Sequence, residues 1–235
     1  MTDAHAAPRG VGVVVVAAGS GSRLGAGVPK AFVPLAGRPL LAWALEAVVR
    51  VEGLGSLVVV APPALSDPEA AAWAGVALPR GARVVAGGAE RSASVAAGLA
   101  ALDPTCDLIL VHDAARCLTP VAVFDRVVEA VRAGHVGVVP GVPVVDTVKA
   151  VDDRGLVTST PDRSSLRAVQ TPQGFRRDVL EAAHAGGAGA TDDAALVEAL
   201  GHRVLVVDGD SRAFKVTTVD DLAHAERLVG GPGYT

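Results

Sequence analysis

The sequence predicts an α/β protein in which helices cover both faces of a mostly parallel, doubly wound sheet. Three observations lead to this prediction. Short apolar segments typical of buried strands alternate along the chain with segments of helical character. The length of 235 residues suits a single domain over residues 1–235. Half of the residues are hydrophobic but only 3% are aromatic, so the core has to be built from Val, Leu and Ala.

The first half of the chain alternates regularly between strands and helices. A strand is predicted at residues 11–16, where five of the six residues are valine, as in strands buried on both faces. Helices are expected at 39–49, from Ser66 onward, at 92–102 and from Thr119 and Pro120 to residue 132, with strands at 54–60, 82–85 and 108–111. Because ligands bind at the carboxyl ends of parallel strands, we expect residues 19–30, 87–94 and 112–116 to meet at one edge of the sheet.

The regularity breaks between Pro140 and Thr171. Residues 142–151 alternate weakly, residues 152–155 form a predicted turn, and residues 156–159 continue extended, which predicts a β-hairpin arm at about 142–159. A two-stranded hairpin is marginally stable alone, so we expect the arm to pack on another surface, such as a second subunit. After it we expect a helix at 177–184, a glycine-alanine linker at 185–190, a helix from Thr191 to Gly201, a strand at 203–207 and a final helix capped by Thr218 and Asp221.

The segment VGVVVVAAGSGSRLGAGVPK at residues 11–30 joins the first strand to a glycine-rich turn with two cations, Arg23 and Lys30. Glycines at this density allow backbone N–H groups to approach an anion, which predicts a phosphate-binding loop. The P-loop pattern is excluded because no Ser or Thr follows Lys30, and the dinucleotide fingerprint because Leu24 replaces its third glycine. A plain turn in which the glycines serve only geometry is the alternative. Pro29, which fixes the backbone just before Lys30, favours phosphate binding.

Three more charged residues are candidates for ligand binding. Asp113 lies just beyond a buried strand, where a carboxylate can hold Mg²⁺ or a ribose hydroxyl; a surface ion pair with Arg116 is the alternative. Lys215 is a single cation in a short apolar segment that we expect to be a strand, and the alternative is a lysine that extends from the sheet edge to solvent. Arg163 either binds an anion with two nitrogens or is an exposed loop arginine.

Composition argues against several functions. A net charge of −4 with scattered basic residues does not predict a nucleic-acid surface. No apolar run is long enough to span a bilayer and the first residues lack a signal-peptide pattern, so we expect a cytoplasmic protein without membrane contact. The two cysteines and six histidines match no zinc or redox spacing, so we expect free thiols and, for any metal, a hard cation held by carboxylate and substrate phosphate.

Seven motifs follow one another along the chain: AAGSGSRLGAGVPK, GGAERSASV, HDAAR, DTVK, TPQGFR, TDDA and FKVT. In this order and at these intervals they resemble the motifs of the 2-C-methyl-D-erythritol 4-phosphate cytidylyltransferases of the non-mevalonate isoprenoid pathway. The resemblance covers about residues 13–228. It implies a Rossmann-like nucleotidyltransferase domain with a protruding β-arm that clasps a second subunit in a homodimer.

The resemblance also implies roles for individual residues. Arg23 and Lys30 would stabilise the transition state at the α-phosphate of CTP, and Arg163 and Lys215 would position methylerythritol phosphate. The residues that would bind the nucleotide are Ala17, Ala18, Gly19, Gly88, Ser94, Asp113 and Arg116, with Asp113 also the Mg²⁺ ligand, and those that would line the sugar-phosphate pocket are Thr147, Thr171 and Thr191. The chain departs from the family at Cys117, where proline is frequent, and at Ala31, where glutamine is frequent.

The implied reaction explains the charges. The substrate phosphate attacks the α-phosphorus of CTP in line and pyrophosphate leaves, so that cations are needed to neutralise two anionic reactants. A ribitol 5-phosphate cytidylyltransferase of the same fold is the nearest alternative. A nucleotide-binding regulator without catalysis is a more distant one, and the cations at the predicted acceptor site, Arg163 and Lys215, argue against it.

Overall fold

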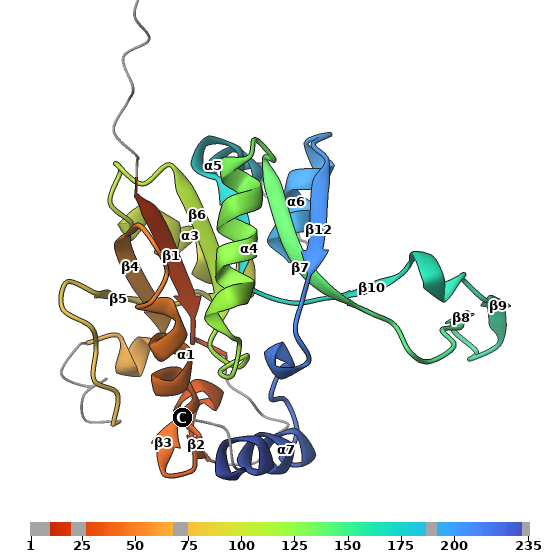
Figure 1. Ribbon diagram of the computed structural model, residues 1–235, viewed down its shortest axis with the longest axis horizontal. Coiled ribbons are helices and arrows are strands. Elements are labelled where there is room, and N and C mark those ends of the chain that lie inside the picture. The colour runs from red at the N-terminus through yellow and green to blue at the C-terminus, as the bar shows by residue number, and fades with distance from the viewer. Residues whose placement is uncertain (1–9, 20–26, 68–74, 187–191, 232–235) are drawn as a thin grey trace, which may run out of the picture.

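The structure is a computed structural model that describes residues 10–19, 27–67, 75–186 and 192–231. Within these residues an eight-stranded sheet has the order β10-β7-β11-β6-β1-β4-β5, with β12 paired to β7 (Figure 1). The strands are β1 (Val11–Val16), β4 (Leu54–Ala61), β5 (Arg83–Ala86), β6 (Leu108–Asp113), β7 (Gly137–Pro143), β10 (Arg167–Val169), β11 (Gln173–Arg176) and β12 (Val204–Asp208). The pairs β1–β4, β1–β6, β4–β5 and β7–β12 are parallel. The prediction of a mostly parallel sheet is confirmed.

Helices cover both faces of this sheet, as expected. On one face, α1 (Leu40–Val48) and α4 (Val121–Arg132) pack on a core cluster that contains Val13 and Val15 of β1. On the other face, α3 (Arg91–Ala101), α5 (Arg177–Ala185) and α6 (Asp193–Ala199) pack on a cluster that contains Val14. The valine run lies at the centre of the sheet because alternate side chains fill the two cores, and all three of these valines are 0% exposed.

Three strands in the second half, β7, β10 and β11, were not predicted. β11 lies between β6 and β7 and is antiparallel to both. It contains a single large apolar residue, Phe175, and its Gly174 lies so close to α4 that a Cβ would stand 2.4 Å from Val127 Cγ1. β7 carries Pro140 and Gly141, which hide its strand character. In β7 and β11 tertiary burial overrides the local pattern, whereas the three residues of β10 are exposed.

An arm leaves the sheet where β7 and β10 end their pairing, at Pro143 and Arg167. It comprises residues 144–166 and projects away from the rest of the protein (Figure 1). It contains the antiparallel pair β8 (Ala150–Val151) and β9 (Val157–Ser159) and the 3-10 turn η4 (Arg163–Ser165). The paired part of the hairpin is therefore shorter than the expected range of 142–159.

The carboxyl-terminal segment returns to the edge of the sheet at which β1 and β6 end. It contains η5 (Ser211–Ala213) and α7 (Val219–Gly230), whose amino terminus has the capping box expected from Thr218 and Asp221. The strand expected around Lys215 is wrong, since the segment has irregular backbone that is tied to the sheet edge by a hydrogen bond from Val216 N–H to Ala115 O, 2.8 Å. The remaining short elements are η2 (Lys30–Phe32), β2 (Pro34–Leu35), β3 (Arg38–Pro39) and η3 (Pro63–Leu65).

Four smaller expectations concern the cap of α4, the two cysteines, the helix from Ser66 and membrane contact. Pro120 is the N-cap residue of α4. The hydroxyl of Thr119 donates to Arg116 O at 2.7 Å, so Thr119 does not cap the helix as expected. Both cysteines are free and buried. The helix expected from Ser66 falls largely on residues 68–74, outside the described ranges. No helix in the described ranges is long and apolar enough to cross a membrane.

Candidate active site

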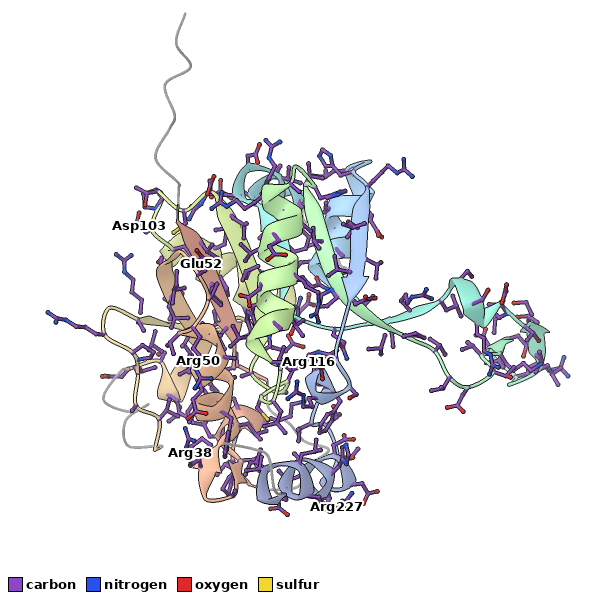
Figure 2. The ribbon with its side chains drawn as sticks, in the orientation of Figure 1. Arg38, Arg50, Glu52, Asp103, Arg116 and Arg227 are labelled. Atoms are coloured by element: carbon purple, nitrogen blue, oxygen red, sulfur yellow. The ribbon has the colours of Figure 1, made fainter. Side chains whose placement is uncertain are left out.

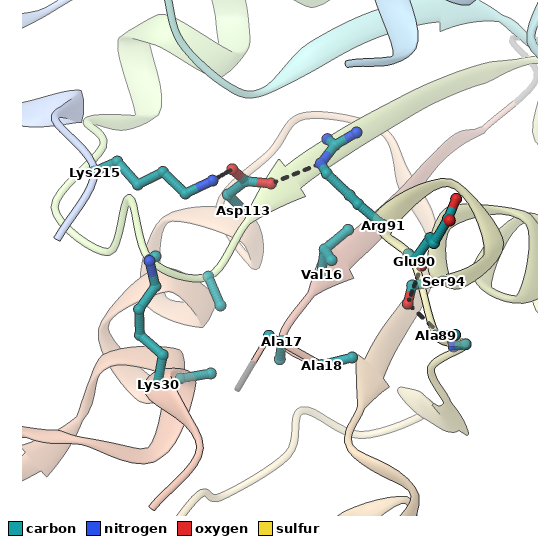
Figure 3. A pocket seen from close by; sticks show the side chains of 15 residues that line it. Val16, Ala17, Ala18, Lys30, Ala89, Glu90, Arg91, Ser94, Asp113 and Lys215 are labelled. Carbon is teal, nitrogen blue, oxygen red and sulfur yellow. Dashed lines mark hydrogen bonds and ion pairs between the residues drawn. The ribbon is translucent and has the colours of Figure 1, made fainter. Parts of the chain in front are cut away.

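A cleft of about 400 Å³ opens where β1 and β6 end and α3 begins (Figure 3). The three segments that were expected to meet at one edge of the sheet contribute to it, as far as the structure describes them. Of the predicted site residues it is lined by Ala17, Ala18, Gly19, Lys30, Gly88, Ser94, Asp113 and Lys215. Its size is that of pockets that bury a small organic ligand.

Small residues form the wall of the cleft opposite Asp113. A Cβ at Gly88 would stand 2.6 Å from the Cβ of Ala93, so only glycine fits this position without a shift of α3. The N–H of Gly88 donates to Ser94 Oγ at 3.1 Å, and the Ser94 hydroxyl donates in turn to Glu90 O at 3.1 Å. The hydroxyl of Ser94 therefore holds the glycine turn in place, and the wall presents mainly backbone groups to a ligand.

Asp113 is the charged centre of the cleft. Its Oδ2 lies 2.7 Å from Lys215 Nζ and its Oδ1 lies 3.4 Å from Arg91 Nε, so that the carboxylate stands between two cations (Figure 3). Burial alone would raise the pKa of Asp113, but Arg91 and then Lys215 lower it by more, and the pKa lies well below its usual range. Asp113 is therefore ionised throughout the physiological pH range.

Arg116 does not form the surface ion pair with Asp113 that was the alternative interpretation. Its two terminal nitrogens donate to Ala213 O at 2.8 Å and to Val169 O at 3.2 Å, and it lies between the sheet edge and the carboxyl-terminal segment (Figure 2). It lines a smaller adjoining cavity of about 130 Å³, together with Thr171. This cavity and the main cleft meet at Arg91, Asp113 and Lys215.

Thr171 connects this second cavity to a buried histidine. Its hydroxyl oxygen accepts the N–H of Asp113 at 3.0 Å and lies 3.0 Å from Nδ1 of His112, which is 0% exposed and packs on Phe124. Burial lowers the pKa of His112 from 6.5 to about 4. The imidazole is therefore neutral at physiological pH and serves to hold Thr171 and the end of β6.

The lowered pKa of His112 predicts a pH dependence of stability. Between pH 6.5 and 4 the unfolded chain binds a proton at this histidine that the folded protein does not, so stability falls with falling pH by up to about 1.4 kcal/mol per pH unit. Urea unfolding of the wild type and of His112→Gln from pH 7 to 4 measures the effect. We expect the variant to lose less stability over this range, and curves that stay parallel would contradict the assignment.

Two of the predicted residues that the structure describes, Thr147 and Arg163, line neither cavity of this chain. Both are exposed and lie on the arm, where one terminal nitrogen of Arg163 donates to Val145 O at 2.5 Å. Arg23 and Thr191 lie outside the described residues. The cleft also contains a cation that sequence reasoning missed, Arg91. Its only signal is its position in GGAERSASV, shortly after Gly88, which lines the cleft.

The two departures from the family motifs are both buried. Ala31, 3% exposed, follows Lys30 in η2 and lines the cleft. Cys117, 3% exposed, packs with Leu118 and Val216 under the carboxyl-terminal segment, where burial raises the pKa of its thiol to about 12. Cys117 therefore fills space as a small apolar side chain and is not a nucleophile.

Comparison with known proteins gives one consistent result. The family model described as IspD, 2-C-methyl-D-erythritol 4-phosphate cytidylyltransferase, matches residues 11–230. A cytidylyltransferase of that name from Nocardia farcinica is 51% identical over 218 residues, 92% of either chain. A bifunctional enzyme IspD/IspF from Clavibacter michiganensis is 55% identical over 222 residues, 93% of this chain but 54% of that protein. The crystal structure of the cytidylyltransferase from Thermus thermophilus superposes with a TM-score of 0.75 at 38% identity, covering 93% of this chain and 98% of that one.

Proposed function

The chain belongs to the 2-C-methyl-D-erythritol 4-phosphate cytidylyltransferase family, and we propose that the cleft beside Asp113 is where it carries out the reaction of that family. It transfers the cytidylyl group from CTP to methylerythritol phosphate and forms 4-diphosphocytidyl-2-C-methyl-D-erythritol and pyrophosphate. The observation that carries the placement is the convergence of Lys30, Asp113 and Lys215, from three distant parts of the sequence, on one cleft.

The two connected cavities suit two anionic substrates that react with each other. CTP occupies the main cleft, where Ala17, Ala18 and Gly88 leave room for the cytosine and present backbone groups to its edge. Methylerythritol phosphate occupies the smaller cavity beside Thr171. The α-phosphate and the attacking phosphate then meet where the two cavities join, which brings the reactants into contact.

Cations counter the charge of both reactants in this scheme. Lys30 and Arg23 stabilise the charge that gathers on the α-phosphate oxygens and on the leaving pyrophosphate, and Lys215 holds the attacking phosphate against its repulsion by CTP. The two lysines reach into the cleft from two different elements, η2 and the irregular segment before α7 (Figure 3). No side chain has to form a covalent intermediate in this scheme.

Asp113 is the residue that would hold Mg²⁺. It is buried, ionised and directed at the cleft, and Mg²⁺ bound with a nucleotide needs only one or two carboxylates besides the phosphates. No group of three or more His, Cys, Asp or Glu side chains is close enough to hold a metal in the described ranges. The donor set therefore fits an ion that arrives with CTP better than a resident metal. When bound, Mg²⁺ would neutralise charge on the phosphate oxygens.

Replacing Lys215 by alanine should chiefly raise KM for methylerythritol phosphate and lower kcat/KM. CTP affinity should change little, because Arg91 still pairs with Asp113 and keeps it ionised. Steady-state kinetics with each substrate varied, together with calorimetric titration with CTP, measures both effects. A large loss of CTP affinity would move Lys215 from the acceptor site to the nucleotide site.

The arm completes the active site of a second copy of the chain in a homodimer. Its hairpin has too few strands to be stable alone, and it exposes the apolar side chains of Val145, Val151, Leu156 and Val157 by 55% to 82%. Thr147 and Arg163 lie on this arm, away from the cleft of their own chain (Figure 1). Docking of the arm on a partner covers the apolar side chains and brings both residues to the partner's sugar-phosphate pocket.

Pyrophosphate release tests the function. The purified protein is incubated with CTP and Mg²⁺ and with methylerythritol phosphate, ribitol 5-phosphate or no acceptor. We expect release with methylerythritol phosphate, little with ribitol 5-phosphate and none without an acceptor. Preference for ribitol 5-phosphate would assign the alternative substrate, and no release with any acceptor would contradict catalysis.

A further inference from the structure

A row of five ionisable side chains runs from the cleft into the protein behind it. Lys215 pairs with Asp113, Asp113 with Arg91, a terminal nitrogen of Arg91 with Asp193 Oδ2 at 2.8 Å, and Asp193 Oδ1 with His184 Nε2 at 3.0 Å. The five come from separate segments of the chain, and Arg91 and Asp193 are 102 residues apart. Their side chains therefore link the helices behind the sheet to the centre of the active site.

Asp193 is the buried carboxylate that joins Arg91 to His184 in this row. Its side chain is 1% exposed and each of its oxygens has its own partner, Arg91 or His184. A carboxylate only accepts hydrogen bonds, so the His184 ring carries its hydrogen on Nε2, and this ring is itself only 6% exposed. Asp192, not Asp193, caps α6, by accepting the N–H of Ala195 at 3.0 Å. The buried charge of Asp193 is thus not needed to begin the helix.

Arg91 uses different nitrogens for its two carboxylates. Burial alone would lower its pKa, but Asp193 and Asp113 raise it by more, so the guanidinium is always charged. The group is planar and rigid, so the 2.8 Å contact with Asp193 sets the direction of the Nε that lies 3.4 Å from Asp113. Arg91 approaches Asp113 from the side opposite Lys215 (Figure 3). Oδ2 of Asp113 is therefore accessible to Lys215, which pairs with it.

We infer that Arg91 is a positioning residue for Asp113 and that Asp193, which pairs with His184, fixes the orientation of the Arg91 guanidinium. The inference rests on the proposed function, because it concerns the geometry of that active site. Without Asp193 the guanidinium can turn so that two N–H groups of one edge pair with both oxygens of Asp113 and displace Lys215. Without Arg91, Asp113 has only Lys215 to orient it and can rotate with that flexible side chain.

A double-mutant cycle tests the inference. Arg91→Ala and Asp193→Asn should each lower kcat/KM about tenfold to a hundredfold, the usual cost of losing a residue that orients an active-site ligand. In the Arg91→Ala background, Asp193→Asn should change kcat/KM by less than about twofold, because Asp193 acts through Arg91. Arg91→Lys should not restore activity, since an ammonium group keeps the charge but lacks the rigid, planar arrangement of N–H donors.

The matched control is the ion pair of Arg132 with Asp107, 2.8 Å long and remote from the cleft. Arg132→Ala and Asp107→Asn should leave kcat/KM within about twofold of the wild type. If circular dichroism shows that Asp193→Asn does not fold, His184→Leu takes its place in the cycle. His184→Gln is then the control, and it should retain activity because glutamine keeps a hydrogen-bond donor to Asp193.

Two outcomes would overturn the inference. In an active protein, effects of Arg91→Ala and Asp193→Asn that multiply in the double variant would show that Asp193 does not act through Arg91. Near-normal activity of Arg91→Lys would show that charge alone matters. An inactive wild type would be a different failure, because it would remove the proposed function and this inference with it.

Discussion

Replacing Lys30 by alanine should lower kcat by at least about a hundredfold, which is the scale of losing one preorganised transition-state donor. The fold should not change. Ala31 and Phe32, which follow Lys30 in η2, are buried, and the Lys30 N–H donates to Gly19 O at 3.3 Å, so the segment stays anchored without the lysine side chain. Steady-state kinetics and circular dichroism of the variant provide the measurement.

Arg38→Ala is the matched control for this prediction. Arg38 is also a cation near α1, but it pairs with Glu46 at 2.6 Å and stacks on Trp43 outside the cleft (Figure 2). Its replacement should leave kcat nearly unchanged. We expect Arg23→Ala to behave like Lys30→Ala, on the family resemblance alone. Near-normal turnover of a correctly folded Lys30→Ala protein would remove this lysine from the transition state.

The elements that could be predicted from the sequence are those with a strong local signal. The valine run of β1 and the Thr218 capping box of α7 are examples, since burial on both faces and helix capping each leave a pattern within a few residues. The common edge for the segments around Lys30, Gly88 and Asp113 followed from the rule for parallel strands alone.

The parts that could not be predicted depend on contacts between distant residues. β11 is a buried strand because α4 and its two neighbouring strands surround it, although its own sequence, Gln-Gly-Phe-Arg, shows no alternation. The partners of Asp113 are a similar case. Its sequence neighbour Arg116 was the obvious candidate, but Arg91 and Lys215 come from other segments, and no pattern in one sequence indicates that pairing.

The active site is proposed to be shared between subunits, with Lys30 from one chain and Arg163 from the arm of the other. Lys30→Ala and Arg163→Ala are prepared separately, each is shown to be inactive, and the two are mixed under conditions that allow subunits to exchange. Mass spectrometry verifies the exchange. The arrangement predicts that activity returns, because in each mixed dimer one site receives both substitutions and the other receives neither.

The recovered activity distinguishes a shared site from a site within one chain. With equal and random exchange, about half of the dimers are mixed and one of the two sites in each is intact, so about a quarter of wild-type activity should return. If Arg163 serves the cleft of its own chain, every site keeps one substitution. Zero recovery despite verified exchange would contradict the shared site.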